Sequence, residues 1–136
     1  MKTAVFMSIK EIHINRILEK TKNHEFRTKK PKKNFDYIIV YVPAPIKELK
    51  YILKVKQPVV RPNNIIVDGY GNKEFNNTEK EKYAYPIESV YKIKKAIKLD
   101  ILKQEFNFTA PQSFAYGEKY QKLLEYIDKV GTTKLY

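Results

Sequence analysis

The sequence contains no cysteine, and this absence excludes three classes of site. There can be no disulfide scaffold, no zinc site built on thiolates and no cysteine nucleophile. Histidine is scarce as well, with only His13 and His24 in 136 residues. Because structural and catalytic metal sites rely heavily on cysteine and histidine ligands, we predict neither a metal site nor a cofactor.

Long hydrophobic runs are also missing. Residues 1–9 form one short mixed run that Lys10 and Glu11 follow at once, which makes it too short for a signal peptide. No later stretch approaches the roughly 20 apolar residues that span a membrane as a helix. The sequence therefore predicts a cytoplasmic protein with no membrane partner.

Acidic residues are much less frequent than basic residues. The chain has 27 Lys and Arg against 15 Asp and Glu, which gives a net charge of +12. Such a surface attracts polyanions, RNA among them, and fits an acidic protein partner equally well. Lysine supplies most of this charge, and a lysine-rich composition can also reflect a genome-wide bias. Eleven Tyr and seven Phe supply apolar core and flat surfaces on which bases can stack.

The hydrophobic pattern predicts several strands and two helices. The strands are expected at residues 3–9, 23–27, 37–42, 49–60 and 83–99. The first helix is expected to begin after Ser8, since Ser8 and Glu11 fit a capping box, and to end near Thr21. The second is expected around residues 120–127, where apolar residues recur at i, i+3, i+4 and i+7, with Gly131 as a stop signal.

Residues 61–78 form the longest irregular stretch. They include Pro62, Gly69, Gly71 and five asparagines, with a helical turn expected around residues 73–78. Stretches of this kind often serve as functional loops or lids. With no internal repeat and no linker, we predict a single domain over residues 1–136. The order of elements favours the α+β class, a small mixed sheet or barrel with helices packed on its outside.

Short motifs stand in order along this pattern. They are Ser8-Ile9-Lys10 before the first helix, Lys22-x-x-Glu25-x-Arg27 after it, Tyr41-Val42-Pro43-Ala44-Pro45-Ile46-Lys47, and Ala110-Pro111-Gln112-Ser113-Phe114-Ala115-Tyr116. In this order and context they resemble the ASCH domain of the PUA-like superfamily. The resemblance implies a small PUA-like mixed β-barrel with flanking α-helices. Lys20 stands where the family usually has glycine.

Lys22, Glu25 and Arg27 are the main candidate site residues. Residues i and i+2 share a face of a strand, so Glu25 and Arg27 point the same way, and Lys22 can swing over that face. Arg27 offers a planar fork for phosphate, and Glu25 can orient either base or accept a hydrogen bond from a nucleobase amino group. The spacing also fits an ordinary salt bridge on an exposed strand. The resemblance implies instead a ligand cleft at the barrel mouth, with Ser8 and Lys10 beside it.

A basic run follows the second expected strand. Proline and like-charge repulsion predict a solvated loop here, which beside a basic cleft would contact a nucleic-acid backbone. The four lysines of this run are Lys29, Lys30, Lys32 and Lys33.

The resemblance implies an RNA or nucleotide-like ligand and a regulatory role in transcription or translation. A second hypothesis is an enzyme, because the K-x-x-E-x-R pattern is similar to the K-x-x-T-x-R of the bacterial N4-acetylcytidine amidohydrolase. There lysine is the base and threonine the nucleophile, whereas here Glu25 stands at the threonine position. Glu25 and Lys22 would then be catalytic, with Glu25 as general base, in a hydrolase of a modified nucleoside or in a ribonuclease. A third hypothesis is a protein-interaction subunit.

Overall fold

A mixed sheet flanked by helices forms the fold. The structure, a computed structural model, describes residues 3–136, so the predicted domain span of 1–136 begins with two residues outside the described part. The strands are β1 Ala4–Ser8, β2 His24–Arg27, β3 Tyr37–Val42, β4 Glu48–Val55, β5 Val59–Val60, β6 Tyr83–Lys98, β7 Ala115–Tyr116 and β8 Thr132–Lys134. The helices are α1 Glu11–Leu18, α2 Asn72–Asn77, α3 Leu99–Phe106, the 3-10 turn η1 Gly117–Tyr120 and α4 Gln121–Val130.

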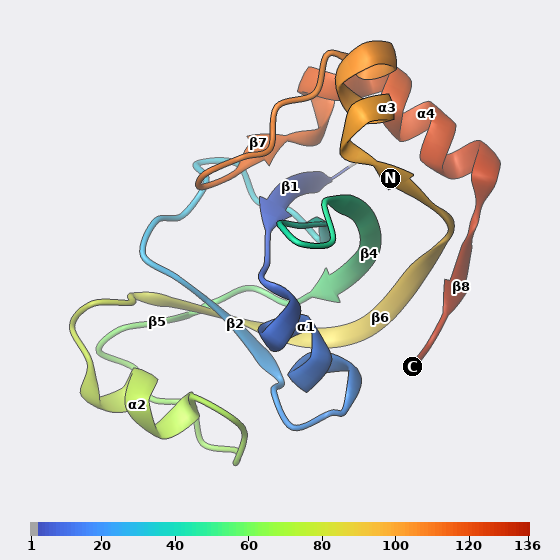
Figure 1. Cartoon of the computed structure of the whole chain (residues 1–136). Coiled ribbons are helices and arrows are strands. Elements are labelled where there is room, and N and C mark those ends of the chain that lie inside the picture. Colours follow the sequence, from blue (N-terminus) through green and yellow to red (C-terminus); the bar gives the residue numbers. More distant parts are fainter. Residues whose placement is uncertain (1–2) are drawn as a thin grey trace.

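The sheet curls because one long strand, β6, pairs with several neighbouring strands. Its order is β2-β6-β4-β3-β1-β7, with β5 and β8 also paired to β6. Strands β1 and β3 run parallel, and the other pairs are antiparallel. The first part of β6 pairs with β2 and β5, and the rest pairs with β4 and β8 across two register shifts. The result is a curled, half-open barrel (Figure 1), which confirms the predicted α+β class.

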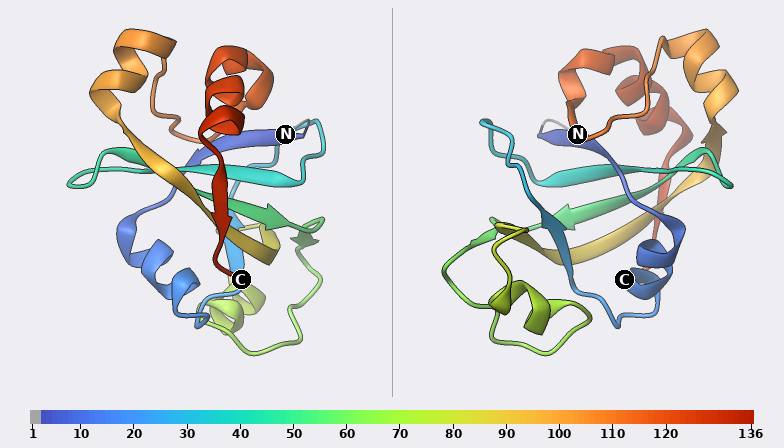
Figure 2. Two further views of the ribbon diagram at one scale, coloured as in Figure 1. Left: turned by 90° about the vertical axis from the view of Figure 1, so that its right-hand side faces the viewer. Right: turned by 60° about the vertical axis from the view of Figure 1, so that its left-hand side comes forward.

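Helices cover both sides of the curled sheet. Figure 2 shows α3 and α4 on one side and α1 with α2 on the other. Alternate residues of β1 serve the two cores, because successive side chains of a strand point to opposite faces. Phe6 packs edge-on against Phe108 in the core under α3 and α4, while Met7 packs with Ile14 and Ile17 in the core under α1.

Helix α1 begins without the predicted capping box. Ser8 is the last residue of β1, and its hydroxyl donates a hydrogen bond of 2.7 Å to the carbonyl oxygen of Pro111. Lys10 occupies the N-cap position with an extended backbone and no side-chain cap. The prediction that Ser8 caps this helix is therefore wrong, because the hydroxyl is engaged by a segment about 100 residues further along the chain.

Lys20 lies just beyond the C-terminal end of α1. Its φ of 66° lies in the left-handed region that glycine adopts without strain. The turn thus keeps the geometry expected for the family's usual glycine, at a conformational cost of about 1–2 kcal/mol for a residue with a Cβ. The Lys20 ammonium lies 4.7 Å from the ring centroid of Tyr136, a cation–π contact that offsets part of that cost. The helix ends at Leu18, short of the predicted end near Thr21.

In residues 3–136 no helix combines the length and apolar character that crossing a membrane requires.

Candidate functional site

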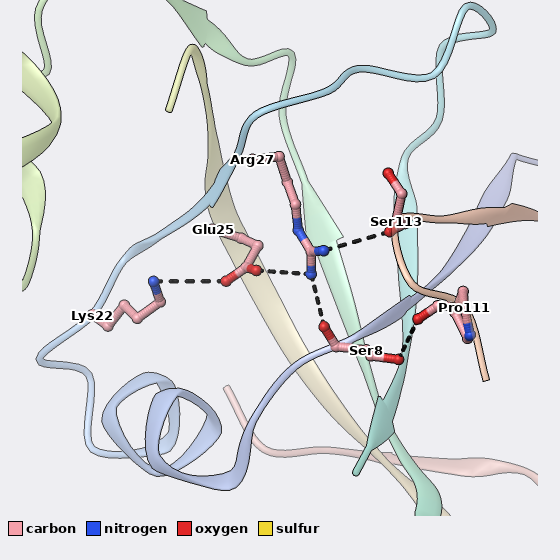
Figure 3. A network of polar contacts seen from close by, with 6 residues as sticks. All are labelled: Ser8, Lys22, Glu25, Arg27, Pro111 and Ser113. Atoms are coloured by element: carbon pink, nitrogen blue, oxygen red, sulfur yellow. Dashed lines mark hydrogen bonds and ion pairs between the residues drawn. The ribbon is translucent and has the colours of Figure 1, made fainter. Parts of the chain in front are cut away.

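Strand β2 presents the K-x-x-E-x-R motif. It pairs with β6, placing Glu25 opposite Tyr85 and Arg27 opposite Tyr83. Because opposed residues of an antiparallel pair lie on the same face, Glu25 and Arg27 point inward with the two tyrosines. Lys22 lies in the turn before the strand, and its side chain reaches the same space (Figure 3).

The three motif residues form a continuous chain of ion pairs. The Glu25 carboxylate lies 3.6 Å from the Lys22 ammonium through Oε1 and 3.0 Å from the Arg27 guanidinium through Oε2. Lys22 is 4% exposed and Glu25 6% exposed. A buried carboxylate shared by a buried lysine and a partly buried arginine is strongly held, because Lys22 left alone would lack its ion-pair partner. This pair therefore differs from an ordinary surface salt bridge.

Arg27 links this ion-pair chain to distant parts of the sequence. Its Nη2 donates to the Ser8 carbonyl oxygen at 3.0 Å, and its Nη1 donates to the Ser113 carbonyl oxygen at 3.4 Å. Ser8 in turn bonds Pro111. The S-I-K motif, the K-x-x-E-x-R motif and the 110–116 motif thus meet at one guanidinium (Figure 3).

The engagement of Arg27 revises its predicted role. Both terminal nitrogens already donate to protein oxygens, so the planar fork faces protein acceptors in place of a ligand phosphate. Its effect is to fix the orientation of Glu25, whose other oxygen faces Lys22. Arg27 is thus a positioning residue in this arrangement.

A cleft of about 350 Å³ opens beside the Lys22–Glu25 pair. Helix α1, strand β2, the 61–78 loop and the segment before β6 each contribute to its wall. The lining residues are His13, Lys22, Glu25, Phe26, Tyr70, Gly71, Glu74 and Glu81. Ser8, Lys10 and Arg27 lie outside this lining, so of the five predicted ligand-binding residues only Lys22 and Glu25 reach the cleft.

The charge of this lining differs from that of the basic cleft expected from the sequence. It contains one lysine and three glutamates, so its formal charge is negative. The excess positive charge of the chain lies on other surfaces, including the exposed basic run of Lys29, Lys30, Lys32 and Lys33. Within this run, Lys33 forms an ion pair, with its ammonium 2.6 Å from the Glu118 carboxylate. The sequence pattern could not reveal this separation, because two of the glutamates come from distant segments.

Burial sets the protonation behaviour of the cleft wall. It lowers the pKa of Lys22, an effect that the Glu25 carboxylate opposes. Burial and the nearby Lys22 charge also lower the pKa of His13, whose Nδ1 has no hydrogen-bond partner among the described residues. The cleft therefore combines a desolvated ammonium, a carboxylate in contact with it and a neutral imidazole, three groups able to donate or accept protons.

The sequence reasoning missed Tyr70, which borders the cleft. The residue is 46% exposed, and the Arg16 guanidinium stacks 3.9 Å from the centroid of its ring. This contact joins α1 to the 61–78 loop. The signal that could have found Tyr70 is its place between Gly69 and Gly71 in a stretch already marked as a functional loop.

A partly buried amide network joins this loop to Asn23, the residue before β2. Asn23 Nδ2 donates to the Asp68 carbonyl oxygen at 2.8 Å, which leaves Asn23 Oδ1 as an acceptor for Asn72 at 3.0 Å and for His24 Nδ1 at 2.7 Å. The imidazole of His24 is therefore protonated on Nδ1. Burial, reinforced by the Lys22 charge, lowers the pKa of His24 to about 4. The loop and Tyr70 are thus held in place by a neutral histidine.

Acidification is expected to destabilise this anchor. Unfolded His24 titrates near 6.5 and the folded side chain near 4, so between these values the unfolded state binds more protons and stability falls as pH falls. We expect a loss of roughly 1–2 kcal/mol between pH 7 and pH 5, allowing for solvent screening. Urea unfolding at the two pH values measures it. His24→Gln should flatten the difference, and an unchanged difference would assign the effect elsewhere.

Metal binding finds no support in this geometry. No group of three or more Asp, Glu and His side chains within residues 3–136 is placed to hold a metal ion.

Comparison with known proteins identifies the fold. No protein-family model matches the chain, and no curated protein matches it significantly. The ASCH protein of Zymomonas mobilis superposes with a TM-score of 0.65 at 22% identity, over 92% of this chain and 96% of that chain. A tyrosine-to-phenylalanine variant of that protein gives 0.66 at 20% identity, over 90% and 97% of the two chains. A serine-to-alanine variant gives 0.66 at 19%, over 92% and 96%. The predicted fold is confirmed, since the chain has the fold of the ASCH protein of Zymomonas mobilis.

Proposed function

We propose that this chain, which has the ASCH fold, is a cytoplasmic RNA-binding protein that takes an unpaired base into the cleft. The observation that carries the proposal is the pairing, in one cleft, of a buried ion pair with an aromatic ring at the border. Proteins read single-stranded RNA by stacking splayed bases on aromatic rings and bonding their edges. The volume, about 350 Å³, falls within the range of roughly 300–1,000 Å³ typical of ligand sites.

The distribution of charge supports a base, in preference to a phosphate, as the occupant. Three carboxylates line the cleft, and like charges would repel a phosphate placed among them. The exposed lysines outside attract the backbone instead. A strand of RNA would therefore lie across the outer basic surface and turn one base inward. The proposal includes a regulatory role in transcription or translation, by analogy of fold.

Binding of single-stranded RNA is expected to weaken steeply with salt. Each neutralised phosphate releases counterions, and the slope of log K against log salt is about −0.7 per contact for single strands. Replacing Lys29, Lys30, Lys32 and Lys33 together by Gln should weaken binding to all sequences alike. It should also make that slope shallower by up to about three units. Fluorescence anisotropy of a labelled RNA across a salt series measures both quantities.

A matched control separates the position of the charges from their number. Lys98, Lys103, Lys122 and Lys129 are exposed at the start of α3 and on α3 and α4, on the other side of the sheet from the cleft. Replacing these four removes the same charge. This control variant should keep more of the RNA affinity than the variant that lacks the four lysines of the 29–33 run. Equal losses in both variants would contradict a role for the 29–33 run, and RNA binding that is absent or independent of salt would contradict the proposal.

A hydrolase is the second candidate, and a specific observation favours it. Burial lowers the pKa of Lys22, and the Glu25 carboxylate lies 3.6 Å away in the same cleft. Perturbed ionisable groups in a cleft are typical of catalytic sites, although structural ion pairs produce them too. In that case Glu25 would activate water and Lys22 would donate a proton or a hydrogen bond, on a modified nucleoside or on RNA.

A further inference from the structure

The cleft is rich in acceptors and poor in donors. Three of its polar side chains are carboxylates, which only accept hydrogen bonds, and Lys22 is its one cationic donor. Glu25 is shared between Lys22 and Arg27. Glu74 and Glu81 form no ion pair with any other residue in the described part of the chain, although both lie at the cleft wall. Two carboxylates without an ion pair among the described residues, here called uncommitted, therefore line the cleft of a protein with net charge +12, and the charge of one of them, Glu81, acts on Lys22.

From this lining we propose that the cleft selects guanine among the four RNA bases, an inference that rests on the proposed function. The Watson–Crick edge of guanine carries two adjacent donors, N1–H and N2–H, beside one acceptor, O6. A single carboxylate accepts from both donors, and Lys22 donates to O6. No other base offers that pattern, since uracil places its single donor between two acceptors and adenine and cytosine offer one amino group each.

The remaining parts of the cleft fit a purine in this orientation. Tyr70, which is 46% exposed, supplies an aromatic surface on which the base can stack. Phe26 stacks on Phe75 and carries the Lys22 ammonium 4.3 Å from its ring centroid, so it holds the donor for O6 at the cleft wall. The ribose and phosphate then point outward, away from the three carboxylates.

A set of short uridine-rich RNAs with one variable central base tests the selection. With guanine at that position we expect affinity at least roughly tenfold higher than with uracil, the discrimination that one good bidentate pair provides. Inosine lacks only the N2 amino group, so it should fall between guanine and uracil. The affinities are measured by anisotropy at one fixed salt concentration.

Variants of the two uncommitted glutamates assign the selection to the cleft. Glu74→Gln with Glu81→Gln should bring the guanine-to-uracil ratio close to one, because an amide oxygen cannot replace a carboxylate that accepts from two donors. Glu105→Gln with Glu125→Gln removes the same charge from exposed positions on α3 and α4 and should keep the ratio. The ratio is the readout, so a general gain in RNA affinity from lost negative charge does not affect it.

The outcomes distinguish a failure of guanine selection from a failure of RNA binding. Equal affinity for all five RNAs would overturn guanine selection and leave RNA binding standing. A preference that survives Glu74→Gln with Glu81→Gln would overturn the assignment to these carboxylates. No binding of any of the RNAs would overturn the proposed function as well.

Discussion

Replacing Glu25 by alanine is expected to destabilise the protein by about 3–5 kcal/mol. The carboxylate is the counter-charge of two cations, at 3.6 Å from the Lys22 ammonium and 3.0 Å from the Arg27 guanidinium, and Lys22 is 4% exposed. Arg27 keeps two carbonyl partners after the change, whereas Lys22 is left buried without its ion-pair partner. Denaturant unfolding at neutral pH measures the free energy of unfolding of both proteins.

Two further variants show where the loss comes from. Glu125→Ala removes a charge from an exposed position on α4 and should change stability by less than about 0.5 kcal/mol. Adding Lys22→Met to Glu25→Ala removes the orphaned cation and should recover part of the loss. A loss below about 1 kcal/mol for Glu25→Ala would mean that the pair behaves as a solvated surface salt bridge.

Glu25→Gln distinguishes the two candidate functions, because it should affect turnover far more than RNA affinity. The amide keeps an oxygen that Lys22 and Arg27 can bond, so the variant should fold and RNA affinity should fall only modestly. In a hydrolase that uses Glu25 as general base, the amide cannot take a proton and turnover should fall by roughly 10²–10⁴-fold while ligand still binds. The measurements are binding and hydrolysis of acylated cytidine and of short RNA by both proteins.

The results sort the functions cleanly. No turnover of either substrate by the wild type favours the binding function. Turnover that survives Glu25→Gln removes Glu25 from the mechanism and makes Lys22 the next candidate base. Glu125→Gln provides the matched control for charge, since it lies on the far helix layer and should leave binding and turnover unchanged.

The local part of the site could be predicted from the sequence because it depends on short spacings. Strand periodicity places Glu25 and Arg27 on one face, and the turn before β2 brings Lys22 to the same space. The structure has both features. The amphipathic spacing likewise predicts α4, and Gly131 follows it with a positive φ of 86°. In each case the deciding interactions join residues only a few positions apart.

The rest of the site depends on contacts between distant segments, which local patterns do not encode. Arg27 bonds the carbonyl oxygen of Ser113, 86 residues away. Tyr70 and Glu74 border the cleft because the amide network of Asn23 joins the 61–78 loop to the residue before β2. The negative lining follows from that docking, and net charge alone predicted the opposite sign.

Helix α3 was missed for a different reason. The apolar spacing of Leu99, Leu102 and Phe106 continues directly from strand β6, so the strand pattern masks the start of the helix. The helix forms because Leu102 is buried in the core and Phe106 packs against Tyr126, with ring centroids 5.5 Å apart. These are tertiary contacts that outweigh the local ambiguity of a short apolar run.

The most direct test of the proposed base-binding cleft is a map of amide chemical shifts during titration with a short single-stranded RNA. If an unpaired base enters the cleft, the largest changes should occur at Lys22, Glu25 and Tyr70, with smaller changes along the 29–33 run. Lys22→Met should abolish the changes at the cleft and leave those along the run. Changes confined to the basic run, with none at the cleft in the wild type, would contradict the account.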